Sequence, residues 1–367
     1  FMIYKNKNIV MEHLQIISSP LNTYYHCPKY NLNKTVKQVT EDREMINNNK
    51  DWYLYYPCGY TSAETQIKHI KPDNYNQKIF MIDGCDMIVS KIHLWMLLLN
   101  YYGRKKASNI MPNSYISNNV KDMFDFETHY NNIKRIDPDA KFILKNNFQR
   151  QKGIKIHNNL TNIKKEIRDS TYLIQDYLKN PFLIIGHKIN LRYYCLIVCK
   201  SNEINVYLHE NGFVYYTANK YVEKTIEFND HITSGYVDRK IYDDNPLTLD
   251  NFYKHLVNKG HNDKKFIDKI NNLFCLVMDA VNTHLCKLYT LKNNTRFQLF
   301  GCDIAPDHNL EPKLMEMNKG PDLNPKDKRD GEVKSKVEND IMDIIDDVNN
   351  IKLDEPNRFY KIWSKRI

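Results

Sequence analysis

The chain lacks the short signatures that identify most nucleotide- and metal-dependent enzymes. It contains no GxxxxGK[ST], no GxGxxG, no HExxH and no GxSxG segment. The missing GxxxxGK[ST] segment excludes one large class of nucleotide-binding proteins. Glycine is also scarce, with 11 among 367 residues. Any functional site must therefore be sought in patterns that are spread along the chain.

Paired cysteines and long apolar runs are missing as well. The eight cysteines form no CxxC pair and no dense framework, and Cys195 and Cys199 lie within an apolar run. We expect buried free thiols in a reducing compartment, rather than a zinc site. The N-terminus has no long apolar core, and the most apolar stretch, 94–99, is too short to span a bilayer. These absences predict a soluble cytoplasmic protein with no membrane partner.

The composition bounds the size and the partners. With 367 residues and 42% hydrophobic content, the chain can form two or three domains, or one large one. Its net charge of +9 favours anionic partners, such as nucleic acid, nucleotide, acidic protein tails or an anionic membrane. Charge alone does not choose among them. The abundance of Asn, Lys, Ile and Tyr indicates an AT-rich genome, as in a protist or a large DNA virus.

Hydrophobic periodicity predicts a mixed chain with many strands in its middle. The first 50 residues are weakly periodic, which indicates an extension or a peripheral part of the first domain. The polar segment 319–332 is typical of a mobile linker. Helices are expected at 91–102, 249–259, 264–284 and from Val333 onward. Strands or extended segments are expected at 78–82, 112–116, 141–145, 154–156, 172–178, 188–198, 204–209, 213–217, 296–305 and 310–318.

Two basic clusters lie on predicted strands. Lys145 ends one strand of a hairpin whose polar loop, 146–153, carries Lys152. This loop is either a solvated tip or a flap over a polyphosphate. Lys188, Asn190 and Arg192 stand at i, i+2 and i+4 of another strand and therefore share one face. That face is either the polar side of a half-exposed sheet or an anion site, because an arginine can bind phosphate oxygens with two N–H groups.

A third cluster is acidic. Asp303 ends a predicted strand, and Glu316 and Asn318 share a face of the next one. Antiparallel pairing of the two strands would bring both carboxylates together, at a cost that a divalent cation removes. Oxygen ligands alone select Mg²⁺. Magnesium beside basic residues is what binding a nucleoside triphosphate requires.

Seven segments, in order, resemble motifs of the tubulin–tyrosine ligase-like family of ATP-grasp ligases. Each is weak alone, but together they extend over roughly residues 56 to 350. The segments are KIHL at 91–94 with PNSY at 112–115, KNNFQRQKGI at 145–154, QDYLKNPFL at 175–183, GHKINLR at 186–192, HITS at 231–234, FGCD at 300–303 and EMNKGP at 316–321.

The resemblance implies an α+β, ATP-grasp fold in which the nucleotide lies between two β-rich subdomains, with a smaller N-terminal domain. It implies boundaries at 1–88, 89–178 and 179–367. It also implies roles for individual residues. The residues near the ATP phosphates or elsewhere along the nucleotide would be Lys91, Lys145, Lys152, Lys188 and Asn190, and Arg192 would face the reacting phosphoryl group. The adenine pocket would be lined by Gln175, Tyr177 and Leu178. His231 and Thr233 would border both the nucleotide and the amino-acid site, and the catalytic residues would be Arg192, Lys188 and His231. Mg²⁺ would be held by Asp303, Glu316 and Asn318.

The activity implied by the resemblance is ATP- and Mg²⁺-dependent ligation. An acceptor carboxylate attacks the γ-phosphate, and the amine of an amino acid attacks the resulting acyl phosphate, so no protein nucleophile is needed. We expect glutamate to be added to tubulin or another acidic protein tail by a monomer that binds no nucleic acid. Tyrosine or glycine ligation, a ligation-deficient ATP-binding module and a nucleic-acid-binding protein are the alternatives.

Four positions depart from the family's motifs. Asn190 stands where the family has aspartate, and Ser234 where it has asparagine. The segment HENGFVY at 209–215 has His209 and Tyr215 where arginines are usual. The second of these arginines is associated with the amino-acid end of the site. Tyr215 therefore bears on the amino-acid substrate and on activity, whereas the nucleotide positions are largely kept.

Overall fold

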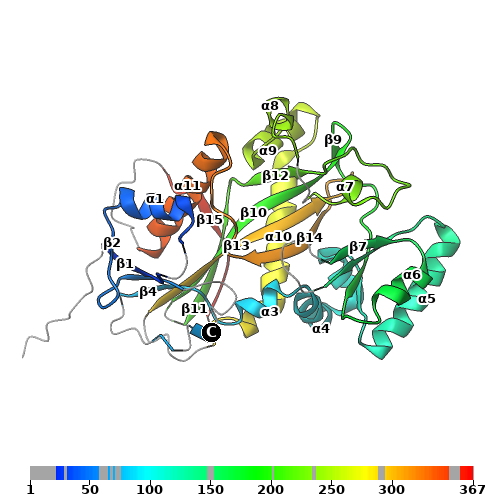
Figure 1. The fold of residues 1–367 in the computed structure, drawn as a ribbon, viewed down its shortest axis with the longest axis horizontal. Helices are drawn as coiled ribbons and strands as arrows, with labels where there is room; N and C mark the ends of the chain where they lie inside the picture. Colours follow the sequence, from blue (N-terminus) through cyan, green and yellow to red (C-terminus); the bar gives the residue numbers. More distant parts are fainter. Residues whose placement is uncertain are drawn as a thin grey trace, which may run out of the picture.

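The protein has a mixed α+β fold built on two β-sheets (Figure 1). The computed structural model describes residues 22–28, 31–57, 65–66, 69–70, 76–146, 153–200, 202–233, 237–287, 294–346 and 356–366. The predicted α+β class is confirmed, and the arrangement is that of an ATP-grasp-like fold. The boundaries placed at residues 88 and 178 stay a prediction.

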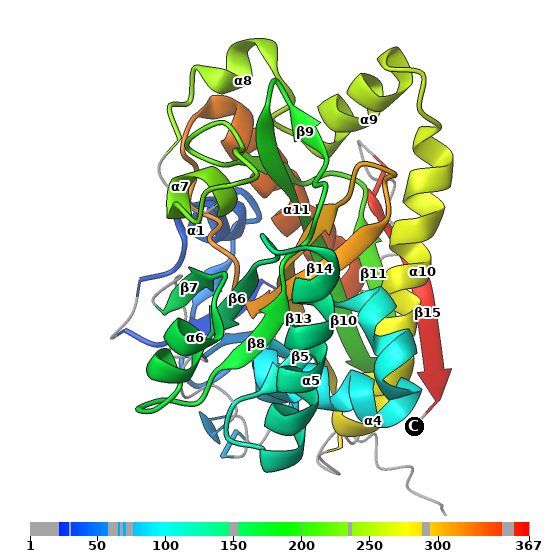
Figure 2. The same ribbon diagram turned by 90° about the vertical axis from the view of Figure 1, so that its right-hand side faces the viewer.

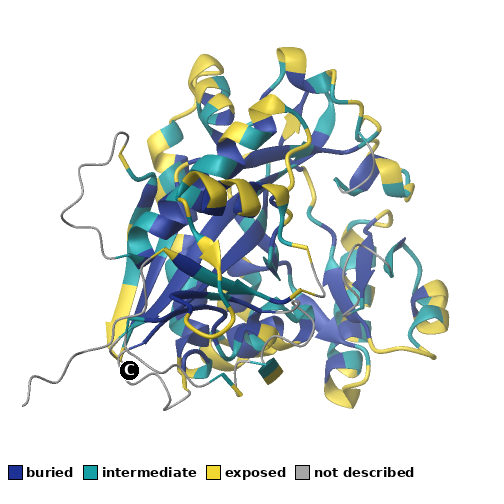
Figure 3. Cartoon of the chain, turned by 60° about the vertical axis from the view of Figure 1, so that its left-hand side comes forward, coloured by how far each residue is buried: buried dark blue, intermediate teal, exposed yellow. Residues whose placement is uncertain are grey.

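The larger sheet contains eleven strands within the described residues. Helices cover its central strands, β10 (His187–Lys200) and β13 (Thr295–Pro306), and the sequences of these two strands are therefore mostly apolar. Figure 3 shows the central strands as the buried interior. Three strands lie beside the main path: β9 (Leu183–Ile184) and β12 (Phe213–Tyr216) pair with β10, and β14 (Pro312–Lys319) pairs with β13. The main order is β15 (Phe359–Arg366), β11 (Glu203–His209), β10 (His187–Lys200), β13 (Thr295–Pro306), β4 (Lys78–Phe80), β3 (Leu54–Tyr56), β1 (Thr23–His26) and β2 (Ile46–Asn47).

Long helices pack on this sheet. Helix α10 (Asp263–Val281) contacts β14 and β15, and α11 (Lys328–Ile345) contacts β10. The stripe predicted on α10, from Phe266 to Val281, is buried as expected. Shorter helices lie along the rest of the chain: α1 (Lys34–Asp42), α3 (Cys85–Val89), α7 (Phe228–His231), α8 (Ile241–Asp244), α9 (Leu249–Asn258) and the 3₁₀ turn η1 (Asn282–His284).

The smaller sheet forms a separate lobe, seen at the right of Figure 1. Its order is β5 (Ser114–Ile116), β8 (Leu173–Asp176), β6 (Phe142–Lys145) and β7 (Ile154–His157). Helices α5 (Val120–Ile136) and α6 (Leu160–Glu166) pack on it around Phe126 and Phe142, whose rings meet edge to face at 5.2 Å. The predicted β6–β7 hairpin is present, and Lys145 lies opposite Ile154 in the pair next to the connecting loop.

Helix α4 (Lys91–Ile110) joins the two lobes. It contacts α10 and β14 on one side and β5 on the other. The Ser90 hydroxyl caps it by accepting from the His93 N–H, so Lys91 is its first residue. Helix α4 lies between α10 and the small lobe (Figure 2). The cap thus fixes Lys91 as its first residue, with the ammonium 3.1 Å from Glu316 of β14.

The expectation of a linker at 319–332 is wrong. The predicted mobile linker at 319–332 begins with the last residue of β14 and ends inside α11. Its middle is held by α1, because the Thr35 hydroxyl donates to the Leu323 carbonyl at 2.5 Å and the Lys34 N–H donates to Asn324 at 2.9 Å. The periodicity also failed to predict α1, α5, α6 and β15.

The cysteine expectation is only partly right. Cys85, Cys195, Cys275 and Cys302 are free thiols, as predicted. Cys199 and Cys286, however, form a disulfide between residues 87 positions apart, and Cys27 is also disulfide-bonded. These three cysteines were expected to be free, and sequence spacing gives no sign of such a distant pairing.

Replacing Phe126 with Ala should destabilise the small lobe. Phe126 is fully buried, so its truncation leaves a cavity and should lower the free energy of unfolding by about 3 to 5 kcal/mol in urea denaturation. Phe124 lies on the same helix but is 74% exposed, so Phe124→Ala should change stability by less than about 0.5 kcal/mol. Equal losses for both variants would contradict the assigned core.

Candidate active site

Strand register places the acidic cluster at the centre of the larger sheet. Arg192 on β10 lies opposite Asp303 on β13, and Asp303 lies opposite Glu316 on β14. Asn318 is opposite Gly301. Directly opposed residues on neighbouring strands have side chains on the same face, so these groups form one row across three strands. The antiparallel pairing expected from sequence does bring the two carboxylates together.

Arg192 forms a two-pronged ion pair with Asp303. Its Nε donates to Oδ1 at 2.6 Å and its Nη2 to Oδ2 at 3.1 Å, which leaves Nη1 unused by the carboxylate. Gly301 makes room for this side chain, because a Cβ there would lie only 2.8 Å from Nη1. The glycine of the FGCD segment is therefore needed for the close approach of Arg192.

The two carboxylates have opposite electrostatic environments. Burial would raise the pKa of Glu316, but the Lys91 ammonium at 3.1 Å and the Asn318 amide at 3.0 Å lower it to about 2. Burial raises the pKa of Asp303, Arg192 opposes this, and the neighbouring Glu316 carboxylate adds to the rise. The Arg192 ion pair thus offsets only part of the cost of burying Asp303 beside a like charge, and a bound cation would offset more of it.

Two lysines from different sheets face the same region. Lys145 ends β6 in the small lobe and is 6% exposed, whereas Lys188 is the second residue of β10 and is 3% exposed. Burial lowers the pKa of Lys188 to about 7, with a further contribution from the charge of Lys145. Burial also lowers the pKa of Lys145, to about 8. Within the described residues neither ammonium contacts a carboxylate, so the pair suits an anionic ligand.

The residues predicted to line the adenine pocket lie at the end of β8. Gln175 is buried, and its Nε2 donates to the Ser114 hydroxyl at 2.8 Å. Among the described residues its Oε1 has no hydrogen-bond partner, and neither has the buried Oδ1 of Asn190 on β10. Tyr177 is buried and Leu178 is half-buried. The two unpaired oxygens are acceptors that a ligand could satisfy.

The remaining predicted residues follow α7 or fall outside the description. His231 is fully buried and lies 2.8 Å from the Tyr177 hydroxyl, and Thr233 follows it, half-buried. Lys152 and Ser234 lie outside the described residues. Sequence reasoning missed Lys141, which is buried with its Nζ 5.8 Å from the Tyr177 ring centre. Its i, i+4 spacing from Lys145 on one strand was the available signal.

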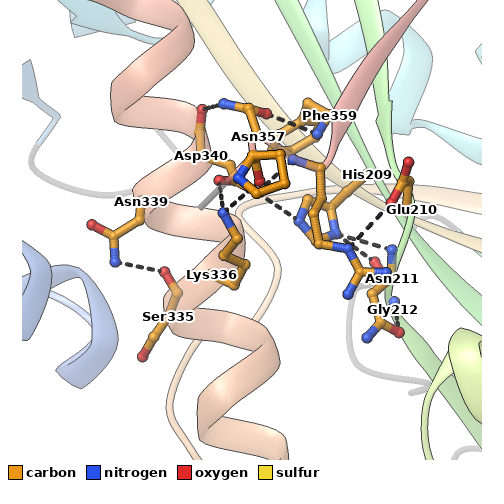
Figure 4. A network of polar contacts seen from close by, with 12 residues as sticks. His209, Glu210, Asn211, Gly212, Ser335, Lys336, Asn339, Asp340, Asn357 and Phe359 are labelled. Carbon is orange, nitrogen blue, oxygen red and sulfur yellow. Dashed lines mark hydrogen bonds and ion pairs between the residues drawn. The ribbon is translucent and has the colours of Figure 1, made fainter. Parts of the chain in front are cut away.

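His209 and Tyr215, which stand where the family has arginines, occupy different surroundings. His209 is completely buried and contacts Asn211, Phe359 and Asp340, whose Oδ2 lies 3.1 Å from Nε2 (Figure 4). Its role is to hold the last strand and α11 on the sheet. Tyr215 instead lies at the site, with the Arg192 guanidinium 5.3 Å from its ring centre. Only the second departure changes the chemistry beside the carboxylates.

Two searches of the described residues bear on metals and membranes. No group of three or more His, Cys, Asp and Glu side chains is gathered there, so the candidate Mg²⁺ ligands are two carboxylates and one amide. Within the same ranges, no helix is both long enough and apolar enough to cross a bilayer.

The fold and the row of charged residues define an ATP-grasp-like protein with two β-rich lobes. Residues 68–354 match the model of the tubulin-tyrosine ligase family, and the chain belongs to this family. It is 25% identical to "Probable tubulin polyglutamylase ttll-9" of Caenorhabditis elegans over 68% of this chain and 64% of that protein. It is also 25% identical to "Tubulin monoglutamylase TTLL4" of Mus musculus, over 73% of this chain and 23% of that protein.

A third relative carries a different named activity. "Tubulin glycylase 3B" of Drosophila melanogaster is 25% identical over 50% of this chain and 26% of its own length. The chain therefore spans less than two thirds of the length of each of these relatives. Their names leave open which amino acid this chain would use.

Replacing Lys188 with Met should stabilise the protein most at low pH. Because its pKa falls from 10.5 unfolded to about 7 folded, the buried charge costs stability below pH 7, and the wild type recovers stability as pH rises toward 10.5. Lys188→Met should raise the free energy of unfolding by on the order of 2 kcal/mol near pH 6, with a shrinking gain above pH 7. Urea denaturation across pH measures this.

The exposed Lys121 on α5 provides the control. Lys121→Met should leave the stability unchanged at every pH. A gain for Lys188→Met that does not depend on pH would show that the ammonium is not held in its charged form against the cost of burial.

Proposed function

We propose that this chain is an ATP- and Mg²⁺-dependent ligase that joins the amine of glutamate to a carboxylate of an acceptor protein through an acyl phosphate. The observation that carries the proposal is the pair of buried lysines, Lys145 and Lys188, opposite the Asp303–Glu316 pair. Buried lysines that form no close ion pair with a carboxylate suit polyphosphate, and adjacent carboxylates suit a divalent cation. We propose tubulin or another acidic protein tail as the acceptor.

The donor set fits Mg²⁺. Asp303, Glu316 and Asn318 can all offer oxygen ligands. The amide N–H of Asn318 donates to Glu316, so the Asn318 Oδ1 remains available to a metal ion. Lys91 and Arg192 neutralise the two carboxylates in the structure. A cation held by these residues would neutralise them in the same way and would supply positive charge to substrate phosphates.

Each remaining residue has a role in this scheme. Lys145 and Lys188 would bind phosphate oxygens, together with Lys91 and Lys152. The free Nη1 of Arg192 would face the reacting phosphoryl group, where fixed positive charge stabilises the transition state. The residues proposed to contact the rest of the nucleotide and the amino acid are Gln175, Tyr177, Leu178, Asn190 and Thr233, with His231 packed beside Tyr177.

We also propose the setting in which the enzyme acts. It would be a monomer in the cytoplasm, or in a host cytoplasm if the source is a virus, and the net charge of +9 would attract an acidic acceptor. No membrane or nucleic-acid partner is proposed.

A second candidate function follows from Tyr215. An aromatic ring, rather than an arginine, faces Arg192 at the end of the site associated with the amino acid. This change favours either a different amino acid, such as tyrosine or glycine, or a module that binds ATP without ligation. Ligation assays with individual amino acids separate these outcomes.

Incubation with ATP, Mg²⁺, tubulin and labelled amino acids should produce a covalent adduct detectable by mass spectrometry. Glu316→Gln should reduce the incorporation rate at least about 100-fold by weakening the metal site. Glu311, an exposed residue just before β14, provides the matched control, and Glu311→Gln should retain the wild-type rate. Full activity of Glu316→Gln would refute the metal assignment, and nucleotide binding without any adduct would favour the binding module.

A further inference from the structure

A chain of hydrogen bonds links Lys188 to the loop before α7. The Lys188 Nζ lies 3.4 Å from the Tyr177 hydroxyl and 4.6 Å from the centre of its ring. The same hydroxyl lies 2.8 Å from the His231 Nδ1. The His231 Nε2 lies 2.8 Å from the Thr225 carbonyl oxygen and 3.1 Å from the Thr225 hydroxyl. This hydrogen-bond chain thus begins at Lys188 on β10, passes through Tyr177 after β8 and His231 of α7, and ends at Thr225 in the loop before α7.

The far end of this chain fixes the proton on His231. A carbonyl oxygen can only accept a hydrogen bond. The Thr225 hydroxyl uses its hydrogen to donate to Asp230 at 2.7 Å, so it too can only accept from the ring. The His231 Nε2 must therefore carry the proton. Burial lowers the pKa of His231, which keeps the ring neutral near pH 7 and leaves Nδ1 as a bare acceptor.

The direction of every other bond follows. With Nδ1 as an acceptor, the Tyr177 hydroxyl must donate to it. The lone pairs of the Tyr177 oxygen are then left for donors, which are the Lys188 ammonium and the neighbouring Tyr221 hydroxyl. The ring beneath the ammonium adds a cation–π attraction. The hydrogen-bond chain therefore holds the Lys188 ammonium in a fixed place without supplying a negative charge. The positive charge of Lys188 remains available to an anionic ligand.

The burial of these groups excludes a direct role for the histidine. His231 has no exposed surface, and the rings of Tyr177 and Tyr221 pack edge-on against it at 5.2 and 5.4 Å. Both ring nitrogens are already used. A substrate could reach His231 only by displacing one of these partners.

We propose that His231 is a positioning residue that acts through the Tyr177 hydroxyl to orient the Lys188 ammonium toward the anionic group of the ligand. The proposal rests on the proposed nucleotide site and changes the role that the family resemblance implies for His231. Tyr177 likewise acts through its hydroxyl on Lys188, in addition to lining the pocket.

A double-mutant cycle on ADP binding tests the proposal, with calorimetry of the full chain and Mg-ADP as the probe. Tyr177→Phe removes the hydroxyl but keeps the ring, and should raise Kd about tenfold, as expected for losing one hydrogen bond to a charged group. His231→Leu should raise Kd by a similar factor. The double variant should bind no worse than Tyr177→Phe alone, because both changes break the same chain.

Two further variants separate positioning from general damage to the fold. His231→Asn keeps an oxygen acceptor near the Nδ1 position and should bind within about twofold of the wild type. His187, adjacent to Lys188 on β10, contacts the Thr217 carbonyl instead, so His187→Leu should not change Kd. Additive losses in the double variant, or failure of His231→Asn to restore binding while the protein remains folded, would overturn the proposal.

The histidine tautomer gives a test that needs no ligand. Nitrogen-15 spectra of histidine-labelled protein, with the His231 signal assigned from His231→Asn, should show the Nε2–H form near pH 7. An Nδ1–H form would reverse the hydrogen bonds and refute the proposal. If the wild type shows the expected tautomer but binds no ADP, the proposed function fails while the hydrogen-bond chain stands.

Discussion

The pairing of β13 with β10 on one side and β14 on the other is the constraint on which the site depends. It places Arg192, Asp303 and Glu316 in one row, so two carboxylates are fixed side by side whatever their mutual repulsion costs. Cations must then lie nearby. Arg192 comes from the same sheet, whereas Lys91 comes from the first turn of α4, which joins the two lobes. The capping of α4 by Ser90 is therefore part of the site, because it sets where Lys91 begins the helix.

The lysines add a second, opposite constraint. Burial lowers the pKa of both Lys145 and Lys188, and in the described part of the chain neither ammonium forms a close ion pair with a carboxylate. A fold optimised for stability alone would not hold two ammonium groups in this way. The anionic ligand proposed for this site would offset the cost of burying both charges. The carboxylate row and the lysine pair come from different sheets, so the relative placement of the lobes determines the electrostatics.

The fold class and most of the candidate site could be predicted from the sequence. The alternation of apolar and polar residues along strands and the order of seven short motifs can both be read from the sequence. The shared face of Glu316 and Asn318 follows from their spacing, and the pairing of Asp303 with Glu316 from the adjacency of their strands. Other features depend on distant contacts. Helix α5 was missed because its apolar residues Val120 and Phe124 are exposed, so its apolar residues do not recur at helical spacing on one face. Segment 319–332 looked mobile because its anchors on α1 are almost 300 positions away in the sequence. The disulfide of Cys199 with Cys286 and the contact of Tyr177 with His231 likewise join segments that no spacing rule connects.

The central claim is that one site holds a divalent cation between β13 and β14 and a polyphosphate against lysines from both sheets. A crystal structure with Mn²⁺ and a non-hydrolysable ATP analogue tests it most directly, because manganese can be located by anomalous scattering. The account predicts an anomalous peak bonded to oxygens of Asp303, Glu316 and Asn318, with phosphate oxygens against Lys145 and Lys188. A nucleotide bound elsewhere, or a manganese peak away from these three side chains, would contradict it.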